Sequence, residues 1–118
     1  MTSKMDLEIY KYSDTTLKLT IKNEETGALE DITSWTIFFT AKEDFETGDS
    51  GADISIDTTS HTNPTAGETE IVIADTDLSS VDPGAYYYDI KVLDDDANVY
   101  VIYEGNLLVK LPITRRVS

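Results

Sequence analysis

Apolar and polar residues alternate along most of this chain. The clearest stretch is residues 86–93, where every second residue from Tyr86 to Val92 is apolar and mostly polar residues fill the positions between. A period of two indicates a β-strand with one buried face. Pro83-Gly84, directly before this stretch, is a turn signal. We therefore predict a strand that starts after the turn and buries its even-numbered face.

The same alternation predicts about eight strands in all. No helical period extends over ten residues, although residues 75–80 could hold a single helical turn. Several short strands separated by turn signals are typical of an all-β sandwich. We predict one β-sandwich domain over residues 1–118, with long loops at 43–53 and 58–67. The predicted strands start near Leu7 and include residues 17–21, 35–41, 54–56, 71–73, 86–93, 99–104 and 107–111.

Five large side chains occupy the inward phase of the central strands and should form the core. They are Trp35, Phe39, Tyr86, Tyr88 and Ile90. Within residues 99–104, the alternation also places Val99, Val101 and Tyr103 on the buried face.

Four other apolar residues fall out of phase with this stripe: Phe38, Tyr87, Tyr100 and Ile102. If their faces are open to solvent, they form an apolar patch of the kind that marks contact with another protein. The alternative is that both faces of the central strands are covered within the domain. Arg115-Arg116, a basic pair in an acidic chain, could dock against an acidic neighbouring copy or could simply be solvated.

Charge and composition exclude several classes of function. The 118 residues carry 23 acidic and 9 basic side chains, for a formal net charge of −14. Nucleic-acid binding needs basic patches that neutralise phosphates, so this class is not expected. The apolar runs are too short to span a membrane. There is no cysteine, which excludes disulfides and thiolate chemistry.

Candidate chemistry is sparse. Asp94-Asp95-Asp96 offers clustered oxygen ligands for calcium, but these are also turn-forming residues with no EF-hand spacing around them. A looser acidic set lies in the 43–53 loop and consists of Asp44, Glu46, Asp49 and Asp53. His61 has no evident base or nucleophile partner. We therefore predict no enzymatic activity, no metal site and no cofactor.

Four short motifs follow one another between residues 6 and 116. They are Asp31-Ile32-Thr33-Ser34-Trp35 with the following Ile37-Phe38-Phe39-Thr40-Ala41-Lys42, then Asp53-Ile54 and Glu70-Ile71-Val72-Ile73, then Pro83-Gly84-x-Tyr86-x-Tyr88-Asp89-Ile90, and finally Gly105 with Leu107, Val109 and Thr114-Arg115. In this order they resemble the N-terminal domain of phage baseplate upper proteins. Relatives of that domain occur among prophage tail, fibre and head accessory proteins.

This resemblance implies an immunoglobulin-like antiparallel β-sandwich with a structural role in the virion of a tailed virus. The role would be in the tail, baseplate or collar, or in the head as a capsid-decorating accessory or adaptor protein. Its partners would be other virion proteins and copies of itself. Two departures are Asp96-Ala97-Asn98, where the family usually has glycine, and the end at Ser118, from which we expect that the chain is not itself a fibre. The alternative class is a carbohydrate- or calcium-binding adhesion module.

Overall fold

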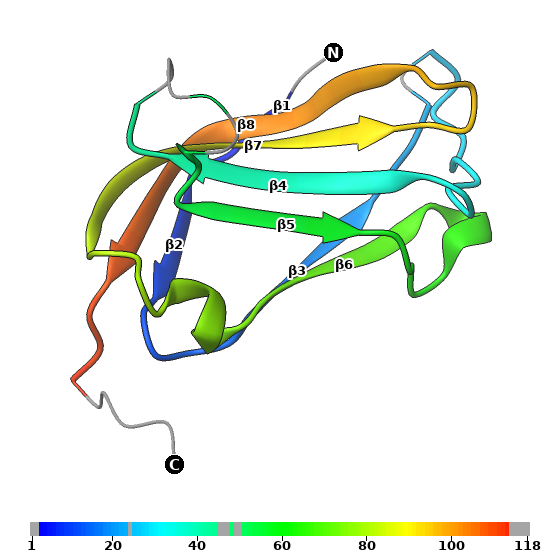
Figure 1. The fold of residues 1–118 in the computed structure, drawn as a ribbon. Coiled ribbons are helices and arrows are strands. Elements are labelled where there is room, and N and C mark those ends of the chain that lie inside the picture. Colours follow the sequence, from blue (N-terminus) through cyan, green and yellow to red (C-terminus); the bar gives the residue numbers. More distant parts are fainter. Residues whose placement is uncertain (1–2, 24, 45–47, 49–50, 114–118) are drawn as a thin grey trace.

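The computed structural model describes residues 3–23, 25–44, 48 and 51–113 (Figure 1). These residues form eight strands and two short 3-10 helices. No described helix is long and apolar enough to cross a membrane. The strands are β1 (Ser3–Lys4), β2 (Leu7–Tyr10), β3 (Thr15–Thr20), β4 (Thr36–Lys42), β5 (Ile54–Thr58), β6 (Glu68–Ile73), β7 (Gly84–Leu93) and β8 (Val99–Lys110), and the 3-10 helices are η2 (Pro64–Ala66) and η3 (Asp75–Leu78).

The strands form two sheets. The larger sheet has the order β1-β8-β7-β4-β5, with β2 also paired to β8, and the smaller sheet consists of β3 and β6. The two sheets lie over one another (Figure 1), and the buried residues of both belong to one hydrophobic core. The all-β sandwich predicted from the alternation is therefore confirmed.

The strand order is that of an immunoglobulin-like domain. In that fold, strands C, F and G lie in one sheet and strands B and E in the other, and variable-type domains add a strand C′ to the first. Here β4, β7 and β8 are neighbours with β5 beside β4, while β3 and β6 take the places of B and E. The Tyr86 hydroxyl donates to the carbonyl oxygen of Asp82 at 2.6 Å, which forms the tyrosine corner of this fold. The chain folds as an immunoglobulin-like β-sandwich.

The larger sheet is mixed, whereas the sequence led us to expect a purely antiparallel arrangement. Both β1 and β2 run parallel to β8, in one register that pairs Ser3 with Tyr103 and Leu7 with Leu107. The strand that follows β2 lies in the opposite sheet, so β2 has no hairpin partner beside it. Its backbone pairs instead with the edge of the last strand.

The core contains the five side chains expected there. Trp35, Phe39, Tyr86, Tyr88 and Ile90 are all buried. The rings of Phe39 and Tyr88 stack with centroids 5.5 Å apart and an interplanar angle of 19°. Stacked aromatic pairs contribute about 0.5–1.5 kcal/mol beyond the area that they bury.

The C-terminal part of the chain differs from its prediction. The two strands predicted at 99–104 and 107–111 are one strand, β8, and its pairing with β7 shifts by one residue. Ile90 is opposite Tyr103 and Lys91 is opposite Val101, so Ile102 is the extra residue of a β-bulge. The bulge reverses the faces of all earlier residues in the strand. Val99, predicted to be buried, is consequently 50% exposed.

Gly105 allows the edge strands to approach β8 closely. A Cβ at this position would lie 2.2 Å from the carbonyl oxygen of Met5, which no L side chain could tolerate. The Tyr88 hydroxyl donates a hydrogen bond to the same carbonyl, from the strand position opposite Gly105. Burial, reinforced by the nearby Asp6, raises the pKa of Tyr88 to about 12.

Replacing Tyr88 by Phe should remove this hydrogen bond and alter the dependence of stability on pH. At pH 9 the variant should be less stable than the wild type by about 0.5–1.5 kcal/mol. The folded-state pKa of Tyr88 lies above its unfolded value, so its contribution to stability is complete below about pH 10 and is lost as the pH rises towards 12. The difference between the two proteins should therefore shrink at pH 11.5 in urea unfolding experiments.

The exposed Tyr12 provides the matched control, because Tyr12→Phe removes a hydroxyl without opening the core. The Tyr12 variant should follow the wild-type curve at both pH values. If the Tyr88→Phe variant is less stable than the wild type by the same free energy at pH 9 and at pH 11.5, the proposed link between Tyr88 ionisation and stability is wrong.

Candidate functional site

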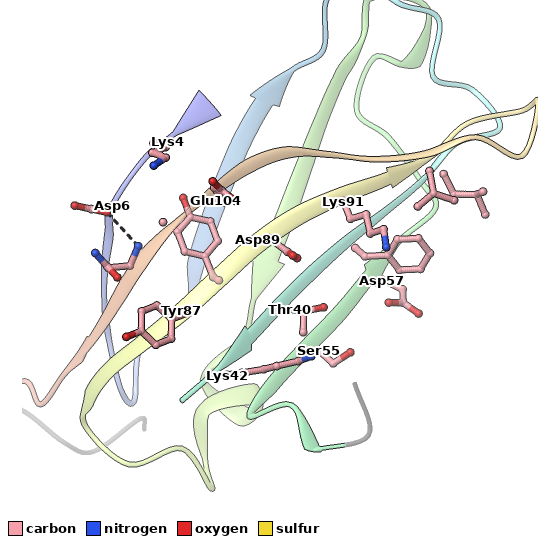
Figure 2. Close-up of a pocket in the computed structure, with 16 residues that line it drawn as sticks. Lys4, Asp6, Thr40, Lys42, Ser55, Asp57, Tyr87, Asp89, Lys91 and Glu104 are labelled. Carbon is pink, nitrogen blue, oxygen red and sulfur yellow. Dashed lines mark hydrogen bonds between the residues drawn. The ribbon is translucent and has the colours of Figure 1, made fainter. Parts of the chain in front are cut away.

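The outer face of the larger sheet, which points away from the core, contains a hollow of about 850 Å³ (Figure 2). We call it the outer-face hollow. Its floor consists of side chains from β4, β5, β7 and β8, and residues next to β1 close one side. Strand pairing arranges these side chains in rows across the sheet, because residues directly opposite one another share a face.

One end of the outer-face hollow contains the row Asp57–Phe38–Lys91, from β5, β4 and β7 respectively. Phe38 is half-buried between its two charged neighbours. In Figure 2, Lys91 and Asp57 both lie at this end. A carboxylate and an ammonium group therefore flank an aromatic ring.

The middle row contains Thr40, Asp89 and Glu104, from β4, β7 and β8, with Lys4 of β1 paired beside Glu104. Asp89 and Glu104 are directly opposite one another on the same face. Like charges in such a pair are destabilising. Lys4 is paired with Glu104 in the register, so a positive charge lies in the same row.

The other end contains Tyr87, which lies opposite Lys42 of β4 and Asn106 of β8. Tyr87 is 39% exposed, whereas Tyr86 and Tyr88 on either side are each 4% exposed. Figure 2 shows Tyr87 at the opposite end of the hollow from Lys91. The backbone N–H of Asn106 donates to the Asp6 carboxylate at 3.1 Å, which fixes the rim.

The outer-face hollow is nearly neutral in a strongly acidic protein. Among its lining residues are three lysines and four carboxylates, which gives a formal charge of −1 out of −14 for the whole chain. Almost all of the excess negative charge therefore lies elsewhere.

The residues proposed from sequence as protein contacts do not share one surface. Phe38 and Tyr87 lie on the outer face, as their phase indicated. Tyr100 does not, because the bulge turns it to the core-facing side opposite Val92, although it remains 41% exposed. Its ring and that of Trp35 form a T-shaped pair with centroids 6.3 Å apart.

Ile102, the bulge residue itself, is partly buried and packs against the core. Arg115 and Arg116 lie outside the described residues. The polar residues that alternate with the apolar ones in β4, β5 and β7 mark the outer face once the register is known.

His61 has a structural position. Its Nδ1 lies 2.8 Å from the Thr69 hydroxyl oxygen and its Nε2 lies 2.8 Å from the carbonyl oxygen of Trp35. A carbonyl only accepts, so Nε2 carries the proton, and in the neutral ring Nδ1 accepts from Thr69. His61 thereby connects the 58–67 loop to β6 and to the residue before β4.

The acidic segment 94–98 forms a turn. The Asp94 carboxylate accepts from the backbone N–H groups of Asp96 and Asn98, at 3.0 and 2.8 Å, and Ala97 has φ +65° where the resembled family usually has glycine. Asp53 accepts from the Glu43 N–H at 3.1 Å, and Asp44 is also described, whereas Glu46 and Asp49 are outside the described residues. In the described part of the chain, no three His, Cys, Asp or Glu residues are arranged to hold a metal ion.

No protein-family model and no curated protein matches this chain. Among solved structures, it is similar to the soluble domain of PmoD from Methylocystis sp. (Rockwell), at 11% identity and TM-score 0.48, over 87% of this chain and 77% of that one. It is also similar to CopC from Methylosinus trichosporium, at 12% identity and TM-score 0.45, over 96% and 87%. Murine CRIg is similar at 10% identity and TM-score 0.42, over 91% and 92%. These similarities are distant and carry no argument about function.

Replacing His61 by Ala should destabilise the protein by about 1–3 kcal/mol, because the buried Thr69 hydroxyl loses its partner. A second change, Thr69→Val, removes that hydroxyl at nearly constant volume. The double variant should therefore be at least as stable as His61→Ala in urea unfolding. If Thr69→Val lowers the stability of the His61→Ala variant by as much as it lowers that of the wild type, the two side chains are not coupled.

Proposed function

We propose that this chain is a non-enzymatic structural protein of a tailed-virus particle and that it acts by repeated protein–protein contact. The observation that carries the proposal is the order of the four sequence motifs, which resembles that of phage baseplate and related tail and head proteins. Other virion proteins and copies of the chain itself would be its partners. A non-enzymatic role is supported by His61, whose two ring nitrogens both face structural groups.

The contact surface is an apolar patch at the edge of the larger sheet, formed by Tyr10 and Leu108. These residues are diagonal neighbours across the β2–β8 pair, on the outer face, and are 44% and 38% exposed. Exposed apolar side chains that lie together typically mark a protein contact. Because aromatic and apolar anchors supply most of the energy of an interface, this patch should contribute more than the surrounding charges.

Charged groups hold this patch in a defined shape. Lys110 forms an ion pair with Glu8 at 3.5 Å and lies 5.4 Å from the centroid of the Tyr10 ring. The negative charge of Glu8 raises the pKa of Lys110. The pair is exposed, so its contribution to stability is small, but it leaves the patch locally neutral.

Self-association through this patch should increase with salt. Each copy carries a charge of −14, and the repulsion between copies extends about 10 Å at 0.1 M salt but only about 3 Å at 1 M. Sedimentation velocity should therefore show more associated protein at 1 M than at 0.05 M NaCl, at equal protein concentration. A Leu108→Ser variant should lose this response.

The matched control is Val72→Ser, which changes an exposed aliphatic residue on the smaller sheet. It should behave as the wild type. If both variants lose the salt-dependent association equally, or if Leu108→Ser keeps it, the patch is not the contact.

The virion assignment has its own test. Tailed-virus particles are purified from the source culture on a density gradient, and their proteins are identified by mass spectrometry. This chain should be present in many copies per particle. Its absence from intact particles, while it is abundant in the cell extract, would refute the structural role.

A further inference from the structure

We propose that the outer-face hollow binds a short, linear, uncharged oligosaccharide. This inference goes beyond the structural role proposed above and concerns a different surface, because neither Tyr10 nor Leu108 lines the hollow. At about 850 Å³ the hollow falls within the roughly 300–1,000 Å³ range of ligand pockets. Three features of its lining indicate the class of ligand.

The first feature is the pair of aromatic rings at its two ends. Phe38 is opposite Lys91, four residues along β7 from Tyr87, and one strand away. With a rise of about 3.4 Å per residue and about 4.8 Å between strands, the two Cα atoms lie roughly 14 Å apart. Each ring offers an apolar surface on which the C–H face of a pyranose can pack. A few pyranose rings in a row would reach from one aromatic residue to the other.

The second feature is the set of polar groups between the two rings. Sugar hydroxyls both donate and accept hydrogen bonds, so they need both kinds of partner. Asp89 and Asp57 supply acceptors, Lys91 supplies donors, and the Thr40 hydroxyl does both. These groups come from adjacent strands of one sheet, so a rigid scaffold holds their spacing.

The third feature is the nearly neutral charge of the lining. A polyanion such as a nucleic acid would meet four carboxylates here and a strongly acidic surface around them. A polycation would gain more from that surrounding surface than from the hollow, whose formal charge is only −1. An uncharged polar ligand is repelled neither by the lining of the hollow nor by the acidic surface around it. The mixed lining also offers both donors and acceptors to its hydroxyls.

The experiment is an NMR titration of the ¹⁵N-labelled full chain with four uncharged probes: maltotetraose, cellotetraose, xylotetraose and chitotetraose. At least one should shift the amide signals of Tyr87, Asp89 and Lys91 in a saturable way at millimolar concentration. Tetragalacturonate, a charged oligosaccharide of similar length, should not. If none of the four probes shifts these signals, or if the charged one binds more tightly, the proposal is wrong.

Two variants locate the site. Tyr87→Ala removes an exposed ring and should weaken binding about tenfold, which corresponds to the loss of one stacking contact. Phe38→Ala should do the same, with its folding checked by the dispersion of the same spectra. Tyr10→Ala, which removes a comparably exposed ring outside the hollow, should bind as the wild type. Unchanged affinity in Tyr87→Ala, or equal loss in Tyr10→Ala, would overturn the assignment.

The outcome is independent of the assembly model. Oligosaccharide binding by a protein that is absent from virus particles would leave this site standing and refute the virion role. Salt-dependent association through Leu108 without any oligosaccharide binding would refute this site and leave the contact patch standing.

Discussion

The Tyr88 side chain connects the centre of the core to the segment between the first two strands, 83 residues away along the chain. Its ring stacks on Phe39 in the centre of the core, and its hydroxyl donates to the Met5 carbonyl at the edge of the larger sheet. This contact requires Gly105 on the neighbouring strand, because any side chain there would collide with Met5. The pairing of β1 and β2 with β8, and hence the side of the outer-face hollow near Lys4 and Asp6, is accompanied by this phenol and made possible by this glycine.

The same residue occupies a position that has a different role in antibody domains. There a cysteine two residues after the corner tyrosine joins the two sheets. Here Tyr86 is the corner tyrosine, and Tyr88 occupies the position two residues later. Its stacking contact with Phe39 and its hydrogen bond to Met5 both lie within the larger sheet. The two sheets are therefore held together by the side chains of the core that they share, and not by this residue.

Much of this architecture follows from the sequence, and the errors have a physical cause. Strand identity and the buried face of β7 could be predicted because polar residues separate its apolar ones. Residues 99–103 are apolar at all five positions, so alternation contains no information about which face is buried. The bulge at Ile102 was therefore invisible, and the placements of Val99 and Tyr100 were wrong.

The candidate site was only half predictable for a related reason. Phe38 shares its phase with the polar Thr40 and Lys42, and Tyr87 shares its phase with Asp89 and Lys91. Both lie on the outer face as expected. The contribution of Lys4 and Asp6 could not be foreseen, because parallel pairing of the first strands with the last one leaves no periodic signal. Gly105 was interpreted as a break between strands, whereas its function is to permit a close approach of two backbones.

Charge distribution links the two proposed surfaces. A chain with a net charge of −14 repels other copies of itself and other acidic macromolecules. This repulsion opposes non-specific contact over most of its surface. The outer-face hollow and the Tyr10–Leu108 patch differ from this average, because lysines nearly balance the carboxylates in the first and Lys110 balances Glu8 in the second. Apolar groups are useful for binding only where a partner can approach without meeting uncompensated charge. Both surfaces meet that condition, and each combines it with exposed or half-buried aromatic rings. The acidity of the rest of the molecule would thus favour binding at these two proposed surfaces over contact elsewhere on the described part of the chain.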